Sequence, residues 1–230
     1  MLLAGAMLAT ALTGCGGSAS SSSDSQNSGN SDSTASGTAF KIGGTGPLTG
    51  ANAIYGNACK NGAQIAVDEI NAEGGDIQFE LNYQDDEHDA EKAVNAYNTL
   101  KDWGMQLSLG SVTSKPCEAT AAENYSDRIF ALTPSASSVA VTADKDNVFQ
   151  MCFMDPNQGT ASAQYIAEQK LGTKIAIIWK NDDVYSTGIH DKFVEEAKAK
   201  GLQVVSDKTF TDASANDFSV QLNDAKEQGR

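Results

Sequence analysis

Four short segments of this 230-residue chain gather small, hydroxyl-bearing or charged residues directly after apolar runs typical of β-strands. Ligands of parallel α/β sheets bind at the carboxyl ends of strands, so chemistry is expected in these segments. Each of them could bind a ligand or could simply shape a turn. They are GGTGPLTG at 43–50, DDEHD at 85–89, GSVTSKPC at 110–117 and TPSASS at 133–138.

The last two segments suit groups of opposite charge. In GSVTSKPC, hydroxyls precede a helix with Pro116 in its first turn, so free backbone N–H groups and the helix dipole favour a carboxylate. Ser114 could instead cap that helix, and one serine can do both. In TPSASS, Pro134 ends a strand, and the small residues after it let carbonyls and hydroxyls approach an ammonium group. An ordinary polar loop would look much the same.

The first two segments favour structural roles. Gly44, Gly46 and Gly50 have a spacing that could cradle a dinucleotide pyrophosphate, but the acidic residue expected about 20 positions later is Asp85, which comes far too late. A tight loop is favoured there. DDEHD has four carboxylates and an imidazole, which are ligands for a hard cation or zinc. Adjacent residues point in different directions, however, so we predict no metal site and a solvated turn in which Asp89 caps the next helix.

Composition narrows the possible functions. The chain has 30 acidic against 16 basic residues and a formal net charge of -14. Nucleic acid is therefore not an expected partner, because phosphate binding needs clustered Lys and Arg. His88 and His190 are the only histidines, and no nucleophile, base and orienting group occur together. We predict that the protein is not an enzyme and uses no cofactor.

Strand-like and helix-like segments alternate from Phe40 onward, which predicts right-handed βαβ units and a parallel sheet with helices on both faces. The first helix should end at 74–75 and bury a face at Ala63, Ala66, Val67 and Ile70. Strands are expected at 40–43, 77–83, 107–109, 129–132, 148–153, 174–179 and 203–209, and further helices at 89–103, 118–126, 158–171, 185–200 and 216–227.

The N-terminal segment predicts a membrane anchor. Residues 2–12 form an uncharged apolar run of the length of a signal-peptide core, too short to span a bilayer. The LTGC string that ends at Cys15 resembles the lipobox of bacterial lipoproteins, which implies a signal peptide at 1–15 and a lipid on Cys15. A buried helix with an incidental cysteine is the alternative. No Lys or Arg precedes the apolar run, so the true start is expected upstream.

Residues 16–38 hold ten serines and four glycines and are expected to be a disordered tether.

Several motifs in order resemble the periplasmic-binding-protein superfamily, and in particular the leucine/isoleucine/valine-binding proteins of ABC importers. They are GPLTG, Tyr55-Gly56, NGAQIAVDEINAEGG, the DD turn, GSVTS, TPSAS and DPNQG at 155–159. The resemblance runs from about Lys41 to the end of the chain. It implies a type I α/β fold with two lobes of parallel βαβ sheets, the first at 39–156 and the second, only partly present, at 157–230. The ligand would lie in the cleft between the lobes.

The resemblance also implies which residues meet the ligand. Ser114 matches the serine that binds the ligand carboxylate together with nearby backbone amides. Ser135 and Ser137, with Ala136 between them, match the positions that offer a carbonyl and a hydroxyl, where relatives often carry Ala and Thr. Burying a charged group is costly unless it is paired, so both ends of the ligand need partners.

Two tyrosines complete the expected site. Tyr55 matches the first-lobe aromatic at the cleft mouth, and Tyr185 matches the second-lobe tyrosine that folds over the ligand, although Tyr185 could instead pack in the core. The implied function is capture of a small amino acid, expected to be branched-chain, and its delivery to an ABC permease and ATPase. The lobes would close about a hinge near 155–159. A sensor of the same fold that signals without transport is the alternative.

The sequence also departs from the family pattern. Where some relatives have a first-lobe disulfide, this chain has His88 and Thr113. We predict a Cys117–Cys152 bridge instead, because the helix start and the strand end that carry these residues should both lie near the cleft.

The chain stops before the next strand of the second lobe is due, so the acidic partner of the ligand ammonium would be missing. An uncovered sheet edge, with poor solubility or self-association, is expected.

Overall fold

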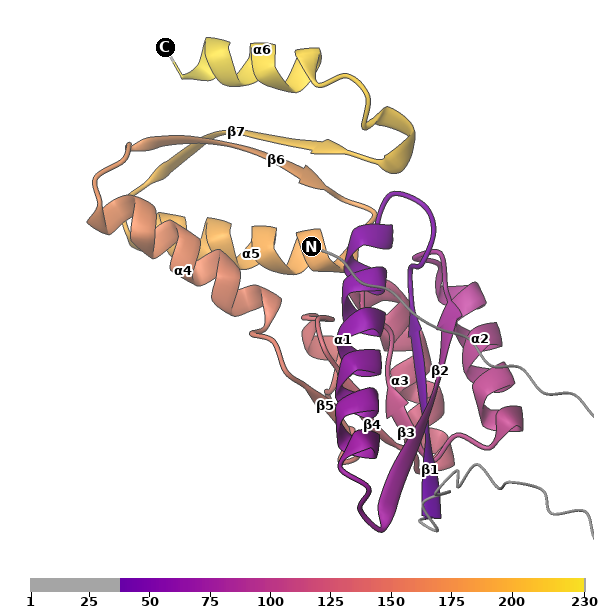
Figure 1. Ribbon diagram of the computed structural model, residues 1–230. Coiled ribbons are helices and arrows are strands. Elements are labelled where there is room, and N and C mark those ends of the chain that lie inside the picture. The colour runs from indigo at the N-terminus through magenta and orange to yellow at the C-terminus, as the bar shows by residue number, and fades with distance from the viewer. Residues whose placement is uncertain (1–37, 230) are drawn as a thin grey trace, which may run out of the picture. The chain divides into compact units, whose positions relative to one another are not determined.

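Two parallel β-sheets organise residues 38–229, the part of the chain that the computed structural model describes (Figure 1). The first sheet has five strands in the order β2-β1-β3-β4-β5, and the second pairs β6 with β7. The predicted α/β class with parallel sheets is confirmed. The predictions for 1–37, including the lipidated Cys15 and nearly all of the tether, lie outside the described residues, and the first strand already contains Thr38.

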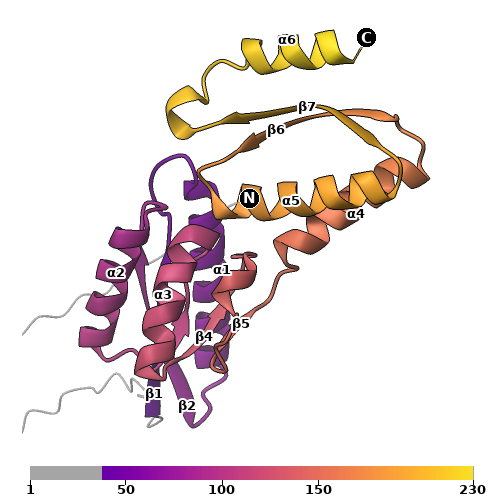
Figure 2. The same cartoon turned by 180° about the vertical axis from the view of Figure 1, so that it is seen from behind.

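The first sheet is built from βαβ units with helices on both faces. Helix α1 covers one face, while α2 and α3 pack side by side on the other (Figures 1 and 2). Since β1 lies between β2 and β3, the chain reverses its direction of travel across the sheet at β1, and ligands bind in such sheets beyond the strand ends at this point. The elements are β1 (Thr38–Gly46), α1 (Ala53–Ala72), β2 (Ile77–Asp85), α2 (Ala90–Trp103), β3 (Leu107–Leu109), α3 (Ser114–Asp127), β4 (Phe130–Thr133), the 3-10 turn η1 (Val139–Val141) and β5 (Val148–Gln150).

The second sheet lies between helices α4 and α5 on one face and α6 on the other (Figures 1 and 2). Gly159 lets the backbones of α4 and α5 touch, because a Cβ at this position would lie 2.2 Å from the carbonyl oxygen of Ile189. The elements are α4 (Asp155–Glu168), β6 (Lys174–Lys180), α5 (Val184–Ala199), β7 (Gln203–Phe210), the 3-10 turn η2 (Asp212–Ser214) and α6 (Ser219–Gln228).

The predicted elements are confirmed in type and order, and the differences lie at their ends. Helices α3 and α4 begin earlier than predicted, at Ser114 and Asp155, and β5 stops at Gln150. The predicted buried face of α1 is mostly wrong, because only Val67 of its four members is buried and Ile70 is 43% exposed. Helical periodicity identified the helix, but burial depends on which neighbours cover it.

The predicted Cys117–Cys152 bridge is wrong. Both residues and Cys59 are free thiols. The Cys117 side chain is 2% exposed and packs in the core with Ala131 and Val148, whereas the Cys152 thiol donates a hydrogen bond to the carbonyl oxygen of Ala136 at 3.3 Å. Burial raises the pKa of Cys117 to about 12, so this thiol stays protonated and packs like a small apolar side chain.

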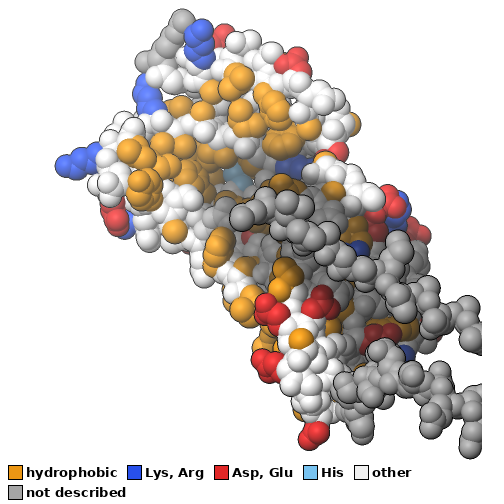
Figure 3. All heavy atoms as spheres, viewed as in Figure 1, with side chains coloured by type: hydrophobic (Ala, Val, Ile, Leu, Met, Phe, Trp, Pro, Cys, Tyr) orange, Lys and Arg blue, Asp and Glu red, His pale blue; other side chains and the backbone are white. Residues whose placement is uncertain are grey.

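Apolar side chains remain exposed around the second sheet. On the face seen in Figure 3, hydrophobic side chains gather over α4 and along β6 and β7. Among the described residues, no helix is long and apolar enough to cross a membrane. The exposed apolar surface around the second sheet is a candidate for the predicted self-association, which stays a prediction. The most exposed large apolar residues in this part of the chain include Phe153, Tyr165, Leu171, Val220 and Leu222.

Candidate ligand-binding cleft

A cavity of about 430 Å³ opens at the carboxyl ends of the strands. Its walls come from the segments after β1, β2, β3 and β4 of the first sheet and from the segments after β6 and β7 of the second. Three of the four segments singled out in the sequence, 85–89, 110–117 and 133–138, contribute residues to this cavity, as the strand-end rule predicts. The first segment, 43–50, contributes none, and the residues directly after it line the cavity instead. The lining residues are Ala51, Asn52, Tyr55, His88, Val112, Thr113, Ser114, Ser135, Ser137, Lys180, Asp183, Tyr185 and Asp212.

Five of the six predicted ligand-binding residues line this cavity, and Ala136 does not. Ala136 is 1% exposed and packs in the core of the first sheet. The two tyrosines are accessible, with Tyr55 58% and Tyr185 40% exposed. The core-packing alternative for Tyr185 is therefore wrong.

Ser114 is bonded across to the loop after β4. Its Oγ accepts the backbone N–H groups of Ser137 and Ser138, each at 3.2 Å, and the residue is 4% exposed. Because these bonds occupy both lone pairs of the hydroxyl, its proton remains to be donated. Ser114 is the first residue of α3, so its role as the N-cap is wrong; Thr113 holds that position without a side-chain cap bond. A free hydroxyl proton beside a helix N-terminus suits an anion.

Ser137 has the opposite polarity. Its hydroxyl donates to Oδ1 of Asp155 at 2.6 Å, and its carbonyl accepts the backbone N–H of Asp155 at 3.0 Å. With its proton committed, the Ser137 hydroxyl has only lone pairs to offer a ligand. The cleft thus has a donating serine and an accepting serine side by side, each facing the same space.

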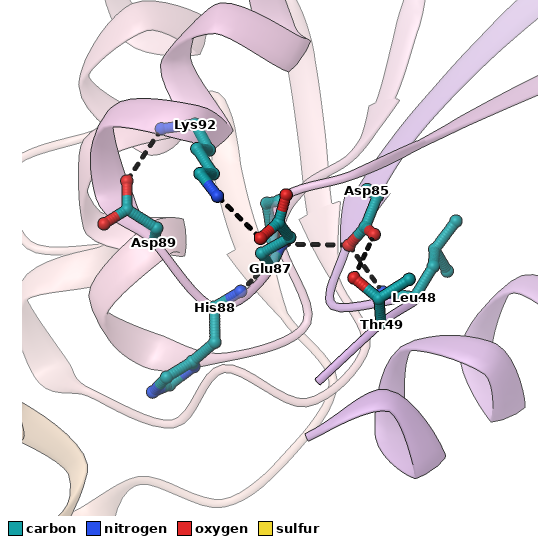
Figure 4. A network of polar contacts seen from close by, with 8 residues as sticks. Leu48, Thr49, Asp85, Glu87, His88, Asp89 and Lys92 are labelled. Carbon is teal, nitrogen blue, oxygen red and sulfur yellow. Dashed lines mark hydrogen bonds and ion pairs between the residues drawn. The ribbon is translucent and has the colours of Figure 1, made fainter. Parts of the chain in front are cut away.

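Polar contacts at the end of β2 and in the turn after it fix the neighbouring loops, as drawn in Figure 4. Asp85 accepts hydrogen bonds from the Leu48 backbone at 2.8 Å and from the Thr49 hydroxyl at 2.6 Å, so it fixes the loop after β1. The predicted cap is confirmed, because Oδ1 of Asp89 accepts the Lys92 backbone N–H at 2.9 Å. The His88 side chain points away from these carboxylates (Figure 4) and lies 2.8 Å from the Thr113 hydroxyl.

Asp86 departs from the predicted solvated turn. The residue is 0% exposed, and burial raises its pKa to about 6, although Oδ1 accepts the His88 backbone N–H at 2.9 Å. Within 38–229 no group of three or more His, Cys, Asp or Glu residues is placed to hold a metal ion.

Gly44 and Gly46 lie within β1 and not in a loop, and a Cβ on Gly44 would meet the Tyr83 ring at 2.4 Å. Close strand packing explains these glycines without a pyrophosphate.

Charged residues that follow the strands of the second sheet also line the cleft, and they were not predicted from the sequence. Lys180 ends β6 and pairs with Asp212 at 2.8 Å, and Asp183 lies at the start of α5. Burial lowers the pKa of His88, and the Asp183 carboxylate opposes this effect. The strand-end rule that selected the first four segments also applies to β6 and β7, so position alone could have identified Lys180 and Asp212.

A parallel α/β fold with two sheets and a polar cleft at its strand ends defines a class of binding proteins. A family model described as periplasmic binding protein matches residues 39–229, and the chain belongs to this family. Its members are substrate-binding proteins, and the family indicates an extracellular or periplasmic location.

Named relatives agree with this assignment. Leu/Ile/Val-binding protein BraC3 of Rhizobium johnstonii is 33% identical over 78% of this chain and 49% of that protein. Leu/Ile/Val-binding protein homolog 3 of Brucella melitensis is 30% identical over 82% of this chain and 51% of that protein. The chain therefore spans about half the length of these relatives.

Solved structures show the same fold. The branched-chain amino acid transporter substrate-binding protein LivJ of Streptococcus pneumoniae, in complex with isoleucine, matches with a TM-score of 0.74 and 30% identity, over 84% of this chain and 55% of that chain. The leucine-binding protein LivK of Thermotoga maritima matches with a TM-score of 0.76 and 26% identity, over 83% of this chain and 54% of that chain. The predicted type I fold is confirmed.

Proposed function

We propose that the protein captures a small amino acid, with a branched-chain amino acid as the first candidate, and delivers it to an ABC permease and its ATPase. The observation that carries this proposal is the pair of cleft serines with opposite hydrogen-bonding polarity. An amino acid presents an acceptor and a donor of opposite charge on one carbon. It therefore matches two adjacent hydroxyls of which one can only donate and the other can only accept.

The proposed orientation follows from these hydroxyls. The ligand carboxylate accepts from Ser114 and lies near the start of α3, and the ammonium donates to Ser137 and to the carbonyl of Ser135. Tyr55 of α1 and Tyr185 of α5 flank the side chain of the ligand. The apolar contribution of Ala51 and Val112, together with these aromatic rings, favours an aliphatic side chain.

In the cell, the two lobes close over the ligand and a lipid attaches the protein to the membrane. The lobes are 39–156 and 157–230, and they close about the segment that begins at Asp155, with ligand favouring the closed state. Cys15 carries a lipid that holds the receptor on the outer face of the cell membrane, extracellular or periplasmic, and the Ser-rich segment is its tether. The protein performs no catalysis.

The test is a binding screen by isothermal titration calorimetry on the full-length protein with the twenty amino acids. Leucine, isoleucine or valine is expected to bind with micromolar or better affinity, and Ser114→Ala to weaken that binding by roughly 100-fold, as loss of a buried bond to a charged group requires. Ser126→Ala, an exposed serine on the same helix, is the matched control and should bind like the wild type. Unchanged affinity in Ser114→Ala would place the ligand elsewhere.

A further inference from the structure

We propose that Asp155 is a positioning residue that selects ligands with an ammonium group by fixing the direction of the Ser137 hydroxyl. The inference rests on the proposed function, since it assumes an amino acid in the cleft. Asp155 does not line the cleft, so it would act through Ser137 and not by touching the ligand.

Asp155 and Ser137 are joined by two reciprocal hydrogen bonds. The Asp155 backbone N–H donates to the Ser137 carbonyl at 3.0 Å, and the Ser137 hydroxyl donates to Oδ1 of Asp155 at 2.6 Å. Asp155 is 1% exposed and Ser137 is 4% exposed, so water does not compete for these bonds. An ionised carboxylate can only accept, and the hydroxyl proton must therefore point toward it.

The hydrogen bonds of Ser137 leave one kind of interaction for a ligand. Its backbone N–H is given to Oγ of Ser114, and its hydroxyl proton is given to Asp155. The hydroxyl lone pairs are what remains, and they accept a bond from an ammonium N–H. A 2-oxo acid of the same shape has only acceptors at that position, so its oxygen would face these lone pairs without a proton between them.

The charge of Asp155 adds to this selection. Its second oxygen, Oδ2, is buried and has no hydrogen-bond partner among the described residues. Burial raises the pKa of Asp155, the Ser137 hydroxyl opposes that rise, and the nearby Asp183 and Glu118 carboxylates add to it. The groups that face it are thus acidic or neutral, and a ligand ammonium one hydrogen bond away would supply the missing positive charge.

The position of Asp155 is held from a second side. A Cβ on Gly188 of α5 would lie 2.9 Å from the Asp155 Cβ, so the helix backbone closes directly over the carboxylate. Because Asp155 heads α4 while Ser137 follows β4, the bonded pair joins the two groups of elements at their connection.

The experiment compares leucine with 4-methyl-2-oxopentanoate, the 2-oxo acid with the same side chain, by calorimetry on the full-length protein. Asp155→Asn is expected to weaken leucine binding roughly tenfold or more, the difference between a charged and a neutral hydrogen-bond partner, while 2-oxo acid binding is unchanged or tighter. Asp102→Asn, an exposed position on α2, is the control and should leave both affinities alone.

Two further measurements separate selection from structural support. If Asp155 acts through Ser137, its substitution in a Ser137→Ala background should change the leucine to 2-oxo acid ratio by less than about twofold. If Asp155→Asn does not fold, the same ratio is measured on Ser137→Ala alone, which removes the oriented hydroxyl and should weaken leucine binding selectively. Equal weakening of both ligands, or an unchanged ratio, overturns the inference. Failure of the wild type to bind any amino acid instead overturns the proposed function, and this inference falls with it.

Discussion

Ser114 and Ser137 follow the neighbouring strands β3 and β4 and are joined by a hydrogen bond of 3.2 Å from the Ser137 backbone N–H to Oγ of Ser114. The bond connects the start of α3 to the loop after β4. Together with the bonds from the Ser138 N–H to Ser114 and from the Ser137 hydroxyl to Asp155, it leaves the Ser114 proton and the Ser137 lone pairs facing the cleft. Local structure and the proposed ligand chemistry therefore depend on the same atoms.

This arrangement predicts that Ser114 stabilises the protein without ligand. Ser114→Ala removes the acceptor of two nearly buried N–H groups, and we expect a loss of about 1 to 3 kcal/mol in the free energy of unfolding. Urea unfolding in the absence of ligand measures this. Ser126→Ala, on the exposed side of the same helix, should change stability by less than about 0.5 kcal/mol, and an equal effect of the two would contradict the assigned bonds.

The contact between α4 and α5 predicts that alanine destabilises the protein at Gly159 but not at Gly62. Gly159→Ala places a Cβ 2.2 Å from the Ile189 carbonyl oxygen, so the helices must separate, at an expected cost of at least about 2 kcal/mol. Gly62→Ala on α1 meets nothing within 4 Å and should stabilise the helix by up to about 1 kcal/mol. Thermal unfolding of both variants tests this, and similar melting temperatures would argue against the close helix contact.

Buried Asp86 predicts a pH dependence of stability. Its pKa is raised to about 6 from about 3.9 in an unfolded chain, so the folded protein holds this proton more tightly. The resulting stability is full below about pH 4 and is lost as the pH rises through 6. Relative to Asp86→Asn, the wild type should lose about 2 to 3 kcal/mol between pH 4 and pH 7 in urea unfolding. A difference between the two proteins that is the same at both pH values would show that Asp86 titrates normally.

The burial of Cys117 predicts that its thiol reacts only when the protein unfolds. Cys117 should not react with a thiol reagent in the native protein, because it is 2% exposed and its pKa is raised by burial, whereas unfolding in urea should expose it. Cys117→Ala is the control: its native titration should match the wild type, and its unfolded titration should show one thiol fewer. A Cys117–Cys152 disulfide would instead leave both silent in urea without reductant.

Much of the fold could be predicted from the sequence, because the signals that define it are local. Alternating strand-like and helix-like periodicity specified the order of the elements, and the strand-end rule selected the segments that carry Ser114, Ser135 and Ser137. The family resemblance added Tyr55 and Tyr185, and all five residues line one cavity. The capping role of Asp89 was equally local, since it depends on a residue three positions away.

Only the tertiary structure decided the properties that depend on contacts between distant parts of the chain. The direction of the Ser114 and Ser137 hydroxyls is set by partners 23 and 18 positions away. The burial of Asp155 and the separation of Cys117 from Cys152 likewise depend on how α3, α4 and the sheet pack. Residue types thus determined which groups reach the cleft, and packing determined where each proton and each charge lies, because hydrogen-bond direction and desolvation are properties of the assembled neighbours.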